Sequence, residues 1–147
     1  MDRPTTIALT PVAPGAILAP FTLGIPRMVS ELAPMPSGVR EIDININRHR
    51  LQRKFLSLRR DFDFVLLIDS DVVITPDVLP ALLASWKPGT TPCINTKGAT
   101  TGHIITSCAL VSVEDYSAIN YLDRPDVCQC LKLPNPFYLE GYSGREI

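Results

Sequence analysis

The sequence lacks the paired cysteines of a zinc site and the basic excess of a general nucleic-acid binder. Its 147 residues include four cysteines, but no two of them are spaced as Cys-x-x-Cys. A zinc site is therefore not expected, and a reduced chain in the cytoplasm fits the cysteine pattern better. The formal net charge of -1 excludes a broadly basic protein that would bind nucleic acid over much of its surface.

The first part of the chain lacks charge, because no charged residue occurs between Pro4 and Pro26. Such a stretch can be a membrane span or a signal segment. Five prolines and two glycines interrupt it, however, and would break a spanning helix repeatedly. No basic segment precedes a clean apolar run, as a signal peptide requires. We therefore expect no membrane span and a cytoplasmic protein.

Internal repeats and low-complexity segments are also absent. The length predicts a single domain over residues 1–147, with enough residues for a substantial core. The strongest structural signal is the apolar run Phe64–Ile68. A short run of this kind predicts a strand buried on both faces, which is typical of a parallel sheet covered by helices.

Two acids, Asp69 and Asp71, follow this run directly. If the strand continues through them, both carboxylates face the same side. Open parallel sheets bind ligands at the carboxyl ends of their strands. Two neighbouring carboxylates repel each other unless a cation or a shared proton intervenes. The pattern therefore predicts a cation site, and the alternative is a pair of solvated acids that open a turn.

The remaining pattern alternates strands with helices and predicts an α/β fold with a mostly parallel sheet flanked by helices. We expect further strands over residues 5–10, 39–46, 92–96 and within 104–113, and helices within 21–32 and over 48–60, 76–86 and 114–122. Loops or turns are expected over 11–15, 34–38 and 98–102, and an irregular tail over 134–147. The strand over 39–46 rests on the alternation of Ile42, Ile44 and Ile46.

Two helices carry more specific expectations. Thr75 should cap the helix that begins at Pro76, and Pro80 should cost that helix a hydrogen bond or a bend. Arg48 and Arg50 should lie at the start of the basic helix over 48–60, where a cation does not complement the helix dipole. Because helix starts bind phosphate well, Arg48 is a candidate contact for an anionic ligand.

Residues 65–72, with Pro76 and the Leu-Pro-Ala-Leu-Leu run over 79–83, resemble the Asp-x-Asp segment of GT-A glycosyltransferases. Residues 47–56 resemble the helix that precedes this segment in the family. Residues 108–116 resemble the strand and helix that follow the family's sugar-binding loop. The resemblance implies a short version of the GT-A fold.

The resemblance also implies a reaction and a cofactor. A sugar would move from a nucleotide-diphospho-sugar donor to an acceptor that is a sugar, a lipid or a protein. Mn²⁺ or Mg²⁺ would neutralise the charge of the diphosphate as it leaves. Asp71 matches the direct metal ligand of the family. Asp69 matches the position nearer the ribose and a water molecule on the metal.

Other residues match the family less specifically. Thr10 and Pro11 match the loop after the first strand, which carries the nucleoside. Glu140, which precedes Gly141, is the candidate base that deprotonates the acceptor hydroxyl in an inverting reaction, and the alternative is a solvated loop acid. His103 is a candidate further ligand for the metal.

Two other functions fit the same residues. Residues 69–73 also fit the nucleophile loop of haloacid-dehalogenase-type phosphatases, in which Asp69 would attack phosphate and Asp71 would handle a proton. Lys97 and the Glu114–Asp115 pair follow in a workable order. That motif normally opens the chain, however, and here it lies near the middle. The third possibility is a nucleotide-sugar-binding domain without catalysis, or a fragment of a larger transferase.

Overall fold

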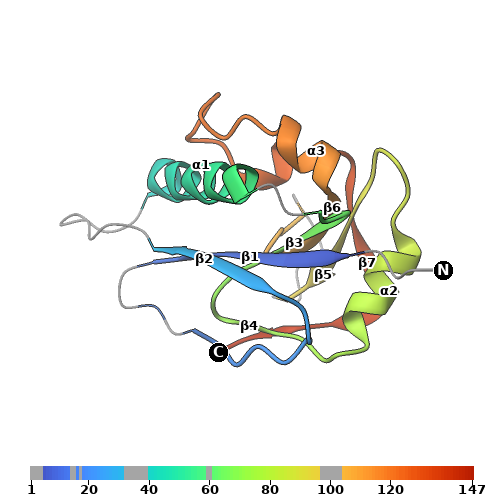
Figure 1. Ribbon diagram of the computed structural model, residues 1–147. Helices are drawn as coiled ribbons and strands as arrows, with labels where there is room; N and C mark the ends of the chain where they lie inside the picture. The colour runs from blue at the N-terminus through green and yellow to red at the C-terminus, as the bar shows by residue number, and fades with distance from the viewer. Residues whose placement is uncertain (1–4, 14–15, 17, 32–39, 59–60, 97–103) are drawn as a thin grey trace.

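A six-stranded sheet forms the centre of the computed structural model, which describes residues 5–13, 16, 18–31, 40–58, 61–96 and 104–147. The strand order is β2-β1-β3-β6-β5-β7 (Figure 1). These strands are β1 (Thr6–Val12), β2 (Arg27–Glu31), β3 (Phe64–Ile68), β5 (Thr91–Asn95), β6 (Cys108–Ser112) and β7 (Pro136–Ser143). A separate ribbon pairs β4 (Val72–Val73) with β8 (Arg145–Glu146). The helices are α1 (Glu41–Leu58), α2 (Val78–Ser85), α3 (Val113–Ala118) and the 3-10 helix η1 (Gln129–Leu131).

The sheet is mostly parallel, as predicted. Strand β1 pairs in parallel with β2 and β3, and β5 pairs in parallel with β7. Only β6 runs the other way, because it pairs antiparallel with both β3 and β5. Figure 1 shows α1 and α3 over one face of the sheet, and α2 with β4 over the other.

Strand β3 separates two hydrophobic cores, because its side chains alternate between the faces. Val65 and Leu67 belong to the core under α1 and α3, and Leu66 and Ile68 belong to the core that faces α2. None of these four side chains is more than 7% exposed. The prediction of an interior strand buried on both faces is therefore confirmed.

Helix α1 begins at Glu41, so the predicted strand over 39–46 is wrong. The carbonyl of Arg40 accepts hydrogen bonds from the backbone nitrogens of Asp43 and Ile44, at 3.0 and 3.1 Å. The Asp43 carboxylate in turn accepts from the backbone nitrogen of Arg40 at 3.0 Å, as in a capping box. The helix here buries Asp43, Asn45 and Asn47 rather than the alternating isoleucines. Local capping by Asp43, together with the tertiary hydrogen bonds of Asn45 and Asn47, thus overrides the period-two pattern.

Helix α2 begins at Val78 rather than Pro76, with Asp77 at its N-cap. Thr75 therefore does not cap it, and instead its hydroxyl donates to the Asp77 carboxylate. Pro80 falls in the first turn of the helix, where backbone N–H groups have no intrahelical partner. Contrary to expectation, this proline costs the helix no hydrogen bond.

Other predicted elements need correction. Residues 21–32 contain the strand β2 instead of a helix, and the tail predicted as irregular contains β7 and β8. Helix α3 ends at Ala118, four residues earlier than the predicted end at Leu122. The predicted turn at 34–38 and loop at 98–102 lie outside the described residues. Within the described part of the chain, no helix combines the length and apolar character needed to cross a bilayer.

Leu67→Ala tests the burial of β3. The side chain of Leu67 is 7% exposed, so its truncation should lower the free energy of unfolding by about 2–5 kcal/mol. Leu131→Ala is the matched control, because Leu131 is 71% exposed and its truncation should cost less than about 0.5 kcal/mol. Urea denaturation followed by circular dichroism measures both. Similar losses for the two variants would contradict the assignment of β3 to the core.

Candidate functional site

A cleft of about 370 Å³ opens at the carboxyl ends of β1 and β3. Its walls come from β1 and the loop after it, from α1, from the turn after β3 and from the residue after β8. The lining residues are Pro11, Ala13, Ala16, Ile44, Asn47, Arg48, Asp69, Ser70, Asp71 and Ile147. Open parallel sheets bind their ligands at this edge.

The two acids lie on a turn rather than on a continued strand. Strand β3 ends at Ile68, and the turn over residues 69–71 leads into β4. Asp69 and Asp71 are partly exposed, and both line the cleft. The geometry of this turn, and not strand alternation, therefore brings the two carboxylates to one cleft.

Three segments far apart in the sequence hold the backbone of this turn. Each residue of the turn makes one backbone hydrogen bond to a different segment. In chain order, the bonds are Asp69 N to Ser107 O at 2.8 Å, Ala19 N to Ser70 O at 2.6 Å, and Ile147 N to Asp71 O at 2.9 Å. The position of the carboxylates thus depends on β6, on the N-terminal segment and on the chain after β8.

The ribbon of β4 and β8 supplies the third of these contacts. Val72 and Val73 pair antiparallel with Glu146 and Arg145. Gly144 precedes this pairing at a close approach, because a Cβ atom there would lie 2.9 Å from the Cγ2 of Ile74 and 3.1 Å from the carbonyl oxygen of Val73. A larger residue would have to push β8 away from the segment that follows the acids.

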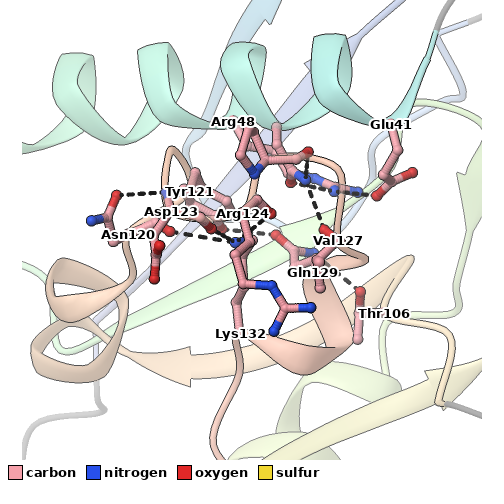
Figure 2. Close-up of polar contacts among 12 residues, drawn as sticks. Glu41, Arg48, Thr106, Asn120, Tyr121, Asp123, Arg124, Val127, Gln129 and Lys132 are labelled. Atoms are coloured by element: carbon pink, nitrogen blue, oxygen red, sulfur yellow. Dashed lines mark hydrogen bonds and ion pairs between the residues drawn. The ribbon is translucent and has the colours of Figure 1, made fainter.

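Arg48 brings a positive charge to the cleft from α1. It lies well inside this helix, so its predicted place at a helix start is wrong. Its side chain is 14% exposed, and its Nη1 donates to Asn45 Oδ1 at 3.1 Å and lies 3.5 Å from Glu41 Oε1. Figure 2 shows this ion pair on α1, above the loop that follows α3. These two neighbours orient the guanidinium.

Hydrogen bonds from Asn45 fix α1 to that loop. The Nδ2 of Asn45 donates to the carbonyls of Pro125 and Val127, at 2.7 and 2.8 Å. The loop is closed on itself by Lys132, whose Nζ donates to the carbonyls of Asn120 and Arg124 (Figure 2). The wall of the cleft that carries Arg48 is therefore anchored to the loop over residues 120–132.

A buried polar chain lies beneath the cleft. The Tyr121 hydroxyl donates to Gln129 Oε1 at 2.8 Å, and Gln129 Nε2 donates to Thr106 Oγ1 at 3.1 Å. Burial raises the pKa of Tyr121, so its phenol stays protonated and can donate this bond. Tyr121 and Gln129 also line a small cavity together with Arg48 and Asp69. Nothing in the sequence pattern marked these residues.

The structure places the other predicted site residues in different surroundings. Pro11 lines the cleft, but within β1, which runs to Val12 instead of ending before a loop. Thr10 does not line it, and its buried hydroxyl has no hydrogen-bond partner among the described residues. Glu140 is exposed on β7, outside the residues that line the cleft. His103 and Lys97 lie outside the described residues.

The acids of the cleft fit a cation that is shared with a substrate. Among the described residues, no group of three or more His, Cys, Asp or Glu side chains could hold a metal ion. Asp69 and Asp71 supply two carboxylates. Mg²⁺ is usually bound through one or two carboxylates, with phosphate oxygens of the substrate and water completing the coordination. The two carboxylates therefore fit a Mg²⁺ or Mn²⁺ ion whose remaining ligands come from water and substrate oxygens.

Comparisons with known proteins identify the fold. No family model matches the chain, and no curated protein shows significant similarity to it. A crystal structure of a glycosyltransferase involved in the glycosylation of the major capsid of PBCV-1 matches 98% of this chain and 93% of its own, with a TM-score of 0.58 and 10% identity. The crystal structure of A197 from STIV matches 97% of this chain and 85% of its own, with a TM-score of 0.57 and 12% identity. The chain thus has a glycosyltransferase-like α/β fold.

Gly144→Ala tests whether β8 holds the turn that carries the acids. The added Cβ should displace β8 and lower the free energy of unfolding by about 1–3 kcal/mol. It should also speed the hydrogen exchange of the amides of Val72 and Ile147, which bond to the turn. Gly89→Ala is the control for the exchange rates: alanine at its positive φ of 78° is strained and should lower stability, but no atom lies within 4 Å of the added Cβ, so neither rate should change. If Gly144→Ala leaves both exchange rates unchanged, β8 does not hold the turn.

Proposed function

We propose that this chain is a metal-dependent glycosyltransferase, which moves a sugar from a nucleotide-diphospho-sugar donor to an acceptor. One observation carries the proposal. Asp69, Asp71 and Arg48 line a single cleft at the carboxyl ends of parallel strands, in a fold shared with a glycosyltransferase. The acceptor is a sugar, a lipid or a protein.

The walls of the cleft divide into an apolar part and a charged part. Pro11, Ala13, Ala16 and Ile44 offer apolar surface to the nucleoside. The charged part is suited to the diphosphate. The cleft volume of about 370 Å³ lies at the lower end of the range for small-molecule sites, which is about 300–1,000 Å³. A nucleoside diphosphate would fill most of such a cleft, so the sugar would extend toward its mouth.

Each charged residue has a distinct role in this proposal. Asp71 would coordinate the cation directly, and Asp69 would lie nearer the ribose and a coordinated water. When bound, Mg²⁺ or Mn²⁺ supplies positive charge that stabilises the departing diphosphate. Arg48 would donate hydrogen bonds to phosphate oxygens from the opposite wall, with its guanidinium oriented by Asn45 and Glu41.

Glu140 stays the proposed base for an inverting reaction. It is an exposed carboxylate on β7, the strand that leads through Gly144 into β8 and Ile147 at the cleft. To act as a base, its carboxylate must come within about 2.6–3.2 Å of the acceptor hydroxyl. A nucleotide-sugar binder without catalysis would use the same cleft and would not need this acid.

Asp71→Asn tests the role of the cation. We expect a nucleoside diphosphate to bind the wild-type chain in the presence of Mn²⁺, and to lose binding in EDTA. Asp71→Asn should weaken this binding by at least about 100-fold, since even outer-shell partners of metal sites contribute 10–100-fold. Its fold should stay intact, because the substitution relieves repulsion between two like charges. Calorimetric titration measures the affinity.

Two further variants complete this test. Arg48→Ala should weaken binding by only about tenfold, because it removes hydrogen bonds to one charged group. Asp61→Asn, at an exposed acid outside the cleft lining and outside the loop that anchors α1, should change nothing. Diphosphate binding that survives EDTA unchanged would rule out the metal bridge. Covalent trapping of beryllofluoride at Asp69 would instead support the phosphatase.

A further inference from the structure

The outer edge of β2 carries backbone groups that face away from the sheet. Strand β2 stands at one end of the strand order, and no other described strand pairs with its outer side. Ala8 is in register with Arg27, and its backbone nitrogen donates to Pro26 O at 2.9 Å. In a parallel ladder, this pattern turns the N–H and C=O groups of Arg27, Val29 and Glu31 outward.

A side-chain contact supports this orientation. The Nζ of Lys54 on α1 donates to the carbonyl of Val29 at 3.3 Å, from outside the sheet. An exposed strand edge with such outward groups is a template for pairing with another strand.

The charges of β2 would pair with those of a second copy of the strand in antiparallel orientation. It reads Arg-Met-Val-Ser-Glu, with Val29 at its centre. If a second copy pairs antiparallel about Val29, Arg27 lies opposite Glu31 of the partner subunit. By the two-fold symmetry, Glu31 lies opposite Arg27 of the partner subunit. These positions and the central pair all use outward-facing backbone groups, so each pair would exchange both of its hydrogen bonds.

We propose that the β2 edge is a homodimer interface, in which two copies pair antiparallel about Val29 and form one continuous sheet. The edge carries a cation at one end and an anion at the other. This distribution matches a second copy in reverse orientation better than it matches a uniformly acidic or basic partner.

Both charged side chains at the edge are at least partly exposed. The guanidinium of Arg27 lies over the ring of Phe21, 4.8 Å from its centroid, and Glu31 is exposed. Opposite charges across a strand pair stabilise it, and like charges destabilise it. A groove of about 540 Å³ runs beside β2 toward the end of α1, and its apolar lining includes Met28 and the 45% exposed Leu58. Association would cover part of this surface.

Lys54 opposes the same contact. Its ammonium competes for the carbonyl of Val29, and the two-fold axis brings it toward Lys54 of the partner subunit. Lysine at a strand edge is a known device against uncontrolled pairing. The interface is therefore a weak one, in a monomer–dimer equilibrium. The two β2 strands would run in opposite directions, so the two clefts would open at opposite ends of the joined sheet. The dimer proposal therefore does not depend on the function of the cleft.

Sedimentation velocity of the wild-type chain and of charge-swapped variants over a wide range of concentration tests this interface. Arg27→Glu should raise the dissociation constant of the dimer at least about tenfold, because both cross-strand pairs become like-charged. Glu31→Arg should do the same. The double variant with both changes should restore the wild-type constant, because it recreates both pairs with the charges exchanged. Lys87→Glu, a charge reversal at an exposed residue after α2, is the matched control and should have no effect.

Two backbone and edge variants complete the test. Val29→Pro removes an outward N–H that β1 does not use, so the monomer should stay folded while the dimer is lost. Lys54→Ala should tighten the dimer several-fold. A wild-type chain that stays monomeric at every concentration would overturn the proposal. A dimer that survives Val29→Pro, or that the double charge swap fails to restore, would overturn it as well.

Discussion

Three backbone hydrogen bonds from distant segments fix the turn over residues 69–71, and much of the fold determines where those segments lie. Two carboxylates on one short turn repel each other, so the turn needs contacts that fix its course. Ser107 reaches it because β6 runs antiparallel to β3, which places the start of β6 beside the end of β3. Ile147 reaches it because the chain after β7 crosses to β4 through Gly144. The antiparallel strand β6 and the β4–β8 ribbon thus both help to fix the turn that carries the two acids.

Helix α1 forms the wall of the cleft that carries Arg48, and hydrogen bonds from buried polar side chains fix the position of this helix. Asn47 exchanges hydrogen bonds with Ser30 at the end of β2, with distances of 2.8 and 3.0 Å. Gln52 donates to the carbonyls of Tyr116 and Ile119, both at 2.8 Å. A buried amide without partners is costly, so these bonds favour one position of the helix over slightly shifted ones. Since Arg48 lies between these two amides, its position relative to the acids follows from them.

Most elements defined by a local sequence pattern were predicted correctly from the sequence. Most elements whose structure depends on contacts with distant segments were not. The apolar run of β3 and the acids behind it form a local signal, and Pro11 and Arg48 do line the cleft with them. The start of α1 was mispredicted for a local reason: the alternating isoleucines indicated a strand, and the cap that Asp43 forms with Arg40 was overlooked. Strands β7 and β8 went unrecognised because their residues are half-buried or exposed, so that only pairing with β5 and β4 defines them. Ile147 could not be assigned to the cleft for the same reason, and Asn47 could not because the position of α1 relative to the sheet depends on tertiary contacts.

The charged residues of the cleft explain why the proposed function would need a cation. Among the described lining residues, two carboxylates share the cleft with one guanidinium, and that guanidinium lies 3.5 Å from the carboxylate of Glu41. A diphosphate in the cleft would lie close to these two carboxylates, at short range where repulsion is only partly screened. The ion pair between Arg48 and Glu41 on α1 keeps a hydrogen-bond donor oriented in the wall of the cleft. Under the proposed function, the cation that arrives with the donor would offset the repulsion between the diphosphate and the two carboxylates.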